Sequence, residues 1–243
     1  MTSLHKGIVL AGGRGTRLGD LTRVTSKQLL PVYDRPMVHY PLATLDAAGI
    51  RDVLVISTPE HLPLYRRLLG DRTGSGASLS YATQPEPDGI ARALNIAATF
   101  LDASPCVLAL GDNLFLDDVS FLPPALARHR GATVFTHRVD DTSDYGTVAL
   151  APDGTVLSIT EKPDTPGPGH AVTGLYVLDA TAPDRAAQLT PSPRGELEIT
   201  DLLRSYLDTG DLHATPLPTT TTWFDAGTPD SLLAAANHVA ASR

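Results

Sequence analysis

A short apolar run at residues 8 to 10 leads directly into a glycine-rich turn. An apolar run of this length predicts a buried strand, and glycines allow the backbone to turn sharply and bring its N–H groups close to an anion. The glycines of this turn are Gly12, Gly13 and Gly15. Two cationic side chains, Arg17 and Lys27, flank the turn. Because fixed amide dipoles and mobile cations together suit a polyphosphate, the stretch predicts a phosphate-binding turn at the end of a strand.

Two better-known glycine motifs do not fit these residues. The dinucleotide-binding fingerprint needs a third glycine at position 18, where the chain has Leu18. The P-loop needs Gly-Lys-Ser/Thr after four spacer residues, and no such triplet follows Gly12. A turn without a ligand is the simplest alternative, but three glycines, two cations and Ser26-Lys27-Gln28 exceed what a turn requires.

The composition favours one α/β domain with a full core, since 42% of the 243 residues are apolar and 19% are charged. The formal net charge of −8 argues against a duplex nucleic acid or an anionic membrane as partner, because either would need a basic face. Cys106 is the single cysteine, which excludes an internal disulfide. The chain has no run of eighteen apolar residues and no signal-peptide pattern, so we expect a soluble cytoplasmic protein.

The hydrophobic pattern predicts a mostly parallel sheet flanked by helices in the first half of the chain. The expected strands are residues 8–10, 52–57, 79–83 (exposed or at an edge) and 107–110, and the expected helices are residues 36–49, 62–69 and 91–101. The second half has strand-like segments joined by Asp-Gly and Gly-Pro turns, which is typical of antiparallel pairs. Its expected strands are residues 133–137, 147–151, 155–160, 172–178 and 212–217, with helices at 198–207 and from Thr228 onward.

Two carboxylates follow short apolar segments. Asp112 comes after the strand expected at 107–110, at the end where open parallel sheets place ligand groups, and Asp225 comes after Trp223 and Phe224. Two carboxylates that leave room for water and phosphate oxygens suit Mg²⁺. An acidic residue at a strand end is more often a turn or cap residue, so each position alone is a weak indicator.

Three polar side chains next to predicted strands are candidates for binding a substrate. Glu161 and Lys162 follow the strand expected at 155–160, where the lysine suits a sugar phosphate and the glutamate suits sugar hydroxyls. A solvated surface pair is the alternative for these two. Gln84 carries a donor and an acceptor on its amide and can therefore read a base edge, although an ordinary turn residue has the same chemistry.

Other functional motifs are absent or have a structural interpretation. The eight histidines show no metal-ligand spacing, and neither Gly-x-Ser-x-Gly nor His-Glu-x-x-His occurs, which argues against serine and zinc hydrolases. The charge-dense stretch at residues 194–201 is interpreted as the capped start of a helix.

The glycine turn Gly12-Gly13-Arg14-Gly15-Thr16-Arg17-Leu18, with the later Ser26-Lys27-Gln28-Leu29-Leu30-Pro31, resembles the signature of the sugar-phosphate nucleotidylyltransferases, most closely their thymidylyltransferase branch. The likeness runs from Lys6 to about Leu233 and includes the segments 110–113, 144–146, 161–163, 172–176 and 223–228. It implies a single domain with a mostly parallel, Rossmann-like nucleotide-binding sheet flanked by helices and an antiparallel sugar-binding extension. The nucleotide-binding half would span about residues 1–130, the sugar-binding half 131–227 and a terminal helix 228–242.

The resemblance also implies a role for each matching residue. The nucleotide would be bound by Leu10, Gly12, Gly13, Gly15, Thr16, Arg17, Gln28, Gln84, Pro87, Gly89 and Asp112. The sugar phosphate would be bound by Gly146, Glu161, Lys162, Val172 and Tyr176, and Mg²⁺ by Asp112 and Asp225. Arg17, Lys27 and Lys162 would be the catalytic residues.

The reaction that the resemblance implies is transfer of a nucleotidyl group from dTTP to glucose 1-phosphate. UTP or another nucleoside triphosphate, and another sugar or cyclitol 1-phosphate, are alternatives with the same chemistry. A glycosyltransferase is a less favoured class, because Gly111-Asp112-Asn113 stands where such enzymes show Asp-x-Asp. A non-catalytic binding module would have lost its charged site residues, all of which are present. The resemblance also allows a homo-oligomer.

The chain departs from the family pattern at several positions. Gly19-Asp20 stands where we expect an aromatic-Pro pair, and Ala226 where we expect Thr. Arg92-Ala93-Leu94 replaces the Gln-Ala-Phe expected beside the sugar, so the sequence leaves open which sugar is bound. One helix follows Asp225, whereas longer members continue with helices that complete a regulatory nucleotide site, so we expect that site to be absent.

Overall fold

The computed structural model describes residues 5–13 and 15–242. A nine-stranded mixed sheet forms its centre, with the strand order β10-β9-β11-β6-β1-β4-β5. In addition, β8 pairs with β11, and β12 pairs with β8. Four strands, β1 (Lys6–Leu10), β4 (Asp52–Ser57), β5 (Ser78–Thr83) and β6 (Cys106–Leu110), are parallel, and β5 lies at the edge as expected. This part confirms the mostly parallel sheet predicted for the first half.

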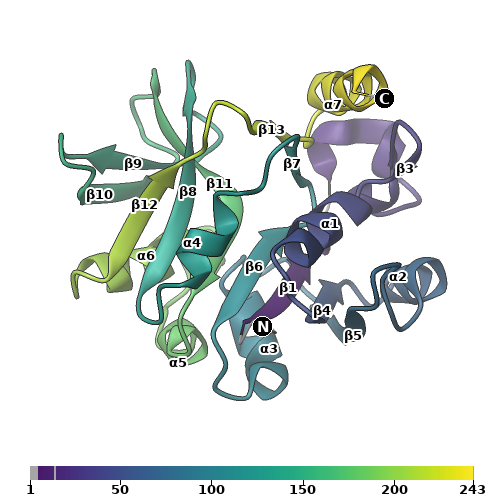
Figure 1. Ribbon diagram of the computed structural model, residues 1–243, viewed down its shortest axis with the longest axis horizontal. Helices are drawn as coiled ribbons and strands as arrows, with labels where there is room; N and C mark the ends of the chain where they lie inside the picture. Colours follow the sequence, from purple (N-terminus) through teal and green to yellow (C-terminus); the bar gives the residue numbers. More distant parts are fainter. Residues whose placement is uncertain (1–4, 14, 243) are drawn as a thin grey trace.

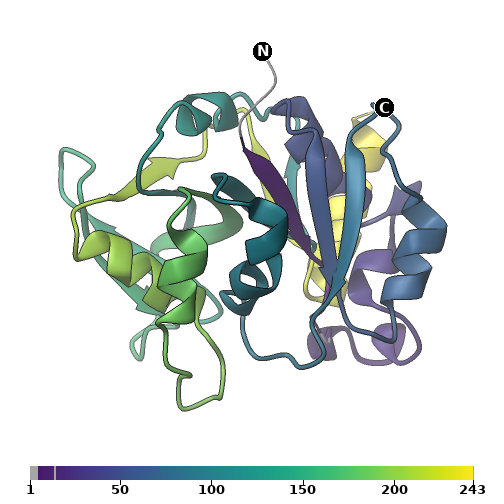
Figure 2. The same ribbon diagram turned by 90° about the horizontal axis from the view of Figure 1, so that it is seen from below.

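Helices cover both faces of the sheet because its strands are apolar on both sides. Figure 2 shows α3 (Arg92–Leu101), α5 (Ala182–Ala187) and α6 (Ile199–Leu207) on one face, and α1 (His39–Ala47) and α4 (Leu122–Leu126) on the other. Ile8 and Leu108 pack into the first core, whereas their neighbours Val9 and Val107 pack into the second. The helix α2 (Leu62–Leu69) joins the second core through the fully buried Tyr65. Alternation along each strand therefore supplies two cores from one run of apolar residues.

The second half of the chain adds an extension to the sheet through the long strand β11 (Gly169–Leu178). This strand is antiparallel to β6, β8 (Ala132–Val139) and β9 (Gly146–Leu150), and β9 in turn is antiparallel to β10 (Val156–Glu161). Figure 1 shows these strands opposite the parallel ones. The expected antiparallel extension is thus confirmed, but β12 (Leu212–Pro216) is parallel to β8.

A small two-stranded sheet, missed in the sequence, lies between β11 and the terminal helix in Figure 1. It pairs β7 (Asn113–Leu116) with β13 (Thr222–Asp225) in antiparallel register, so that Asp225 lies opposite Asn113. The terminal helix α7 (Pro229–Ala241) follows, and Thr228 and Ser231 form the capping box at its start. It packs on the hairpin β2 (Pro31–Val32) and β3 (Arg35–Pro36), above the parallel strands in Figure 1. Among the described residues, no helix has the length and apolar character needed to span a bilayer.

Candidate active site

Two adjoining cavities open beside the carboxyl ends of the parallel strands. The smaller, of about 170 Å³, is lined by the glycine turn after β1 and by the loop after β5. The larger, of about 270 Å³, lies among residues that follow β6, β8, β10 and β13. Ile90 and Glu196 line both cavities, which therefore meet along these two side chains. The two cavities therefore form one continuous cleft along the carboxyl ends of the strands.

The smaller cavity collects most of the residues expected to bind a nucleotide. Its lining includes Leu10, Gly12, Gly13, Gln84, Pro87 and Gly89. Gly15, Thr16 and Gln28 do not line it. Gly15 instead caps the 3₁₀ segment η1 (Thr16–Thr22) with a positive φ of 64°. Gln28 is 1% exposed and its Oε1 accepts a hydrogen bond of 2.6 Å from Ser26, so it supports the glycine turn from below in this structure.

The loop after β5 is fixed against the stretch before α6. The N–H of Leu197 donates to the carbonyl of Asp88 at 2.8 Å, and the N–H of Ala91 donates to the carbonyl of Leu197 at 3.1 Å. Gly89 has a φ of 109°, and a Cβ at this position would lie 2.3 Å from the Leu197 carbonyl oxygen. Only glycine permits this approach, which holds Gln84 at the floor of the cavity.

The paired carboxylates are brought together by the β7–β13 sheet. Asp112 lies two residues after the end of β6. Its backbone carbonyl accepts a hydrogen bond of 2.9 Å from the N–H of Ala226, which holds the segment after Asp225 against Asp112. Asp225 is 13% exposed and Asp112 11% exposed in their side chains. Ala226, at the position where Thr was expected, is fully buried and makes this link through its backbone. The two acids, 113 positions apart in the chain, therefore share one site.

Each carboxylate is paired with a cation of the N-terminal segment. Lys27, in the 3₁₀ segment η2 (Lys27–Leu29), donates a short hydrogen bond to Asp112. Arg17 contacts Asp225 at 3.4 Å and Asp144, in the loop between β8 and β9, at 2.9 Å. Gly227 makes room for this guanidinium, because a Cβ there would lie 2.6 Å from Arg17 Nη2.

These surroundings shift the two carboxylates in opposite directions. Burial alone would raise the pKa of Asp112, but the Lys27 ammonium holds it below its usual range. Burial and the charge of Asp112 raise the pKa of Asp225, against the opposing effect of Arg17.

The carboxylate pair fits a divalent cation. Asp225 Oδ1 is buried without a hydrogen-bond partner, which is costly unless a cation binds there. In the part of the chain that the structure describes, no group of three or more His, Cys, Asp or Glu side chains could hold a metal. Two carboxylates alone suit Mg²⁺, which keeps several waters and takes further oxygens from phosphates.

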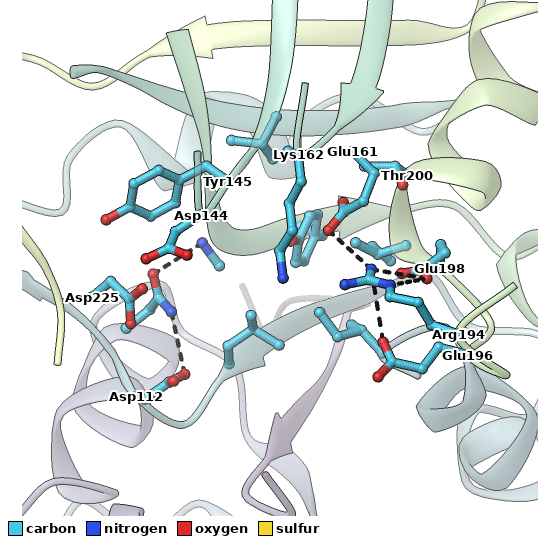
Figure 3. A pocket seen from close by; sticks show the side chains of 18 of the residues that line it. Asp112, Asp144, Tyr145, Glu161, Lys162, Arg194, Glu196, Glu198, Thr200 and Asp225 are labelled. Carbon is cyan, nitrogen blue, oxygen red and sulfur yellow. Dashed lines mark hydrogen bonds and ion pairs between the residues drawn. The ribbon is translucent and has the colours of Figure 1, made fainter. Parts of the chain in front are cut away.

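Lys162 extends into the larger cavity between two groups of acidic side chains (Figure 3). It follows β10 with a φ of 39°, an uncommon conformation for a lysine, and its N–H donates to the carbonyl of Tyr145 at 3.1 Å. Its ammonium makes no hydrogen bond or ion pair with any described residue. This geometry holds a cation ready for an anionic ligand.

The other residues expected to bind the sugar phosphate line the same cavity. They are Gly146, Glu161, Val172 and Tyr176. Burial raises the pKa of the Tyr176 phenol, so the hydroxyl stays protonated at neutral pH. A Cβ on Gly146 would lie 3.0 Å from Thr200 and 3.4 Å from Glu161 Oε2, so glycine keeps this wall open.

Several site residues were not predicted, and the charged stretch 194–201 is the clearest case. Arg194 pairs with Glu198 at 2.9 Å and with Glu161 at 3.4 Å, and it lines the larger cavity with Glu196. Glu198 precedes α6 but its side chain makes no capping hydrogen bond, so the interpretation as a helix cap alone was wrong. The density of charge in this stretch was the available signal.

Asn113 lines the larger cavity and joins three segments there. Its Oδ1 accepts hydrogen bonds from the Gly174 N–H at 3.1 Å and from Trp223 Nε1 at 2.8 Å. A register shift in β11 between Val172 and Tyr176 brings Gly174 to this position. The other unpredicted lining residues are Ile90, Leu110, Asp144, Tyr145, Ile199, Thr200 and Trp223.

The stretch Arg92-Ala93-Leu94 does not border the cavity that we expected it to shape. Ala93 and Leu94 are fully buried in the core, and Arg92 lies outside both cavities, paired with Asp88 at 3.2 Å. These three residues therefore do not line the cavity in which we expect the sugar phosphate.

The fold and the cleft define an α/β protein with a glycine turn, a cluster of cations and two carboxylates at the ends of its parallel strands. The chain matches the family model described as nucleotidyl transferase over residues 6–242, and it belongs to this family. It is 52% identical over 239 residues to glucose-1-phosphate thymidylyltransferase from Xanthomonas campestris pv. campestris, covering 97% of this chain and 80% of that one. The corresponding protein of Neisseria gonorrhoeae is 50% identical over 236 residues, with coverage of 96% and 82%.

Solved structures support the same assignment. A Bacillus anthracis protein assigned as a glucose-1-phosphate thymidylyltransferase, crystallised with sucrose, has a TM-score of 0.88 and 37% identity, covering 96% of this chain and 94% of that one. A UDP-glucose pyrophosphorylase in complex with UDP-glucose has a TM-score of 0.86 over the whole of both chains at 21% identity, which shows the shared fold. The family and fold expected from the sequence are confirmed.

Proposed function

We propose that this protein transfers a thymidylyl group from dTTP to glucose 1-phosphate, which gives dTDP-glucose and pyrophosphate. The observation that carries the proposal is the pair of cavities that meet at Ile90 and Glu196 beside the two carboxylates. The names of relatives at 50–52% identity support the choice of both substrates. The nucleotide would occupy the half up to about residue 130 and the sugar phosphate the half from 131 to 227.

The chemistry is a single in-line displacement. A phosphate oxygen of glucose 1-phosphate attacks the α-phosphorus of dTTP, the bond from that phosphorus to the bridging oxygen breaks, and pyrophosphate leaves with the electron pair. Lys162, unpaired among the described residues, would bind and orient the attacking phosphate. Arg17 and Lys27 would leave their carboxylate partners and contact the phosphates of the nucleotide, where their charge offsets the negative charge that develops.

Asp112 and Asp225 would hold Mg²⁺ in this reaction. When bound there, Mg²⁺ supplies positive charge to the α-phosphoryl group and the pyrophosphate. The unpartnered Oδ1 of Asp225 supports this assignment. Because nucleoside triphosphates are made and consumed in the cytoplasm, we propose the same location for this protein.

UTP is the second nucleotide to consider, because an amide carbonyl at Gln84 would accept the N3–H of uracil as well as that of thymine. The test is pyrophosphate release with Mg²⁺ across dTTP, UTP, CTP, ATP and GTP, each with glucose 1-phosphate and with other sugar phosphates. Turnover that requires both partners and is strongest with dTTP and glucose 1-phosphate supports the proposal. If folded protein binds a nucleotide but turns over no pair, the proposal fails.

A further inference from the structure

We propose that Asp88 and Arg92 are positioning residues that fix the orientation of the Gln84 amide and thereby exclude cytosine from the nucleotide cavity. This inference deepens the proposed nucleotidyl transfer and rests on it for the place of the base. It concerns side chains that lie outside the substrate contacts described above.

The amide nitrogen of Gln84 has both of its hydrogens engaged. Nε2 donates to Asp88 Oδ1 at 2.8 Å and to the carbonyl of Gly89 at 3.1 Å. Gln84 is 6% exposed, so this side chain has little freedom to rearrange. Its Oε1 accepts no hydrogen bond from any described residue and is therefore the group left for a ligand. A flipped amide would place Oε1 against two acceptors, which disfavours that orientation.

Asp88 is held in place from two sides. Its Oδ2 contacts Nε of Arg92, the first residue of α3, at 3.2 Å. Its carbonyl accepts the Leu197 N–H at 2.8 Å, which anchors the backbone of the loop. A carboxylate is an acceptor only, so Asp88 cannot donate a hydrogen bond to Gln84 Oε1 if the amide is flipped. Asp88, held by Arg92, therefore favours one of the two orientations of the Gln84 amide.

This constraint has a direct consequence for base selection. Thymine and uracil both present an N3–H donor, which the Gln84 carbonyl accepts. Cytosine presents an unprotonated N3, so two acceptors would face each other in the cavity. Leaving a buried acceptor unpaired is expected to weaken affinity by roughly 5- to 150-fold, which corresponds to about 1–3 kcal/mol. The fixed amide is thus expected to reject cytosine without separating thymine from uracil.

The sharpest perturbation is Asp88→Asn, which preserves size and the backbone contact. Arg92 attracts the carbonyl end of the new amide, which leaves its NH₂ group facing Gln84. That group donates to Gln84 Oε1 in the flipped amide, which leaves the Gly89 carbonyl as the single opposing acceptor. The flipped amide, whose Nε2 can donate to cytosine N3, is therefore less disfavoured than in the unmodified protein. A role in which Asp88 only fills space would not respond to this change.

The experiment compares kcat/KM for dTTP, UTP and CTP in the unmodified protein and in Asp88→Asn, with glucose 1-phosphate as the second substrate. Asp88→Asn is expected to raise the CTP to dTTP ratio about tenfold or more, while the UTP to dTTP ratio stays unchanged. Glu86→Gln is the matched control, because Glu86 is an exposed acid of the same loop with no hydrogen bond or ion pair among the described residues. An equal loss with all three nucleotides, or an unchanged CTP to dTTP ratio, would overturn the inference.

A measurement on the unmodified protein decides the matter if Asp88→Asn does not fold. The chain has only three glutamines, Gln28, Gln84 and Gln188, so their side-chain amides can be resolved by ¹⁵N labelling and assigned by single substitutions. Both Gln84 amide protons are expected to exchange with water much more slowly than those of the exposed Gln188, with and without dTTP. Equally fast exchange at both residues would refute the positioning role.

Failure of the inference can be separated from failure of the proposed function. Normal turnover of dTTP with an unchanged CTP to dTTP ratio in Asp88→Asn would overturn only the positioning role. If no pair of substrates were turned over, equilibrium binding of dTTP and CTP to the same variants would still test the amide orientation.

Discussion

Replacing Gly89 with alanine tests whether the nucleotide loop depends on its close approach to Leu197. Gly89 has a φ of 109°, and the new Cβ would lie 2.3 Å from the Leu197 carbonyl oxygen and 2.5 Å from its nitrogen. The unfavourable backbone conformation costs about 1–2 kcal/mol. Because both contacting atoms belong to the backbone, the clash adds about 1–3 kcal/mol or displaces the loop. We therefore expect Gly89→Ala to lose about 2–5 kcal/mol of unfolding free energy, or to bind nucleotide poorly.

Gly76→Ala separates the two contributions to that loss. Gly76 has a similar φ of 95°, but a Cβ there would meet nothing within 4 Å, so this variant pays the backbone cost alone. Urea unfolding measures both variants, and kinetics measures the KM for dTTP and for glucose 1-phosphate. We expect Gly89→Ala to raise the KM for dTTP about tenfold or more, with a small change for glucose 1-phosphate. Equal stability of the two variants, together with an unchanged KM for dTTP, would refute the reasoning.

Three further changes probe other parts of the molecule. Asp225→Asn should lower kcat about a hundredfold or more at saturating Mg²⁺, and a kcat within threefold of the original would contradict a metal role. Lys162→Met should raise the KM for glucose 1-phosphate about tenfold with little change for dTTP, whereas an equal rise for both would place this lysine elsewhere. Burial alone would raise the pKa of Asp179, but hydrogen bonds from Thr181 and from the Gly131 N–H hold it below its ordinary value of 3.8. Its stabilising effect is present above that pH and is lost on acidification, so Asp179→Asn should cost about 1–3 kcal/mol at pH 7 and progressively less below pH 3.8, as followed by urea unfolding.

Elements with strong local signals were predicted closely from the sequence. The strand at 52–57 and the helix at 62–69 have the predicted bounds, because a continuous apolar run and a terminal glycine mark their ends. The capped start at Thr228 was also correct, since its hydrogen bonds involve residues only three positions apart. These features depend on residues that are close together in the sequence, so the local sequence pattern is enough to predict them.

Features that depend on distant pairing were missed. The strands β7 and β13 have four residues each, and they form only because one lies beside the other across more than a hundred positions. The parallel pairing of β12 with β8 likewise has no local signal. The local sequence around Arg194 indicates only a helix start, because its partner Glu161 lies 33 positions earlier, at the end of β10. Contacts between residues distant in the sequence therefore determine the parts of the site that the local sequence pattern does not predict.

The ion pairs of the cleft suggest how one site holds many charges before and during the reaction. Lys27 is paired with Asp112 and Arg17 with Asp225, so each acid expected to bind Mg²⁺ has a cation of the chain beside it. When a triphosphate binds, Asp112 and Asp225 would hold Mg²⁺, and Lys27 and Arg17 would leave these acids and contact the phosphates. Each buried acid and each phosphate would then have a positive charge beside it, so no buried charge would be left unpaired. Lys162 stands outside this exchange, because no described carboxylate pairs with it, and in the proposed reaction its ammonium would bind the second, attacking phosphate.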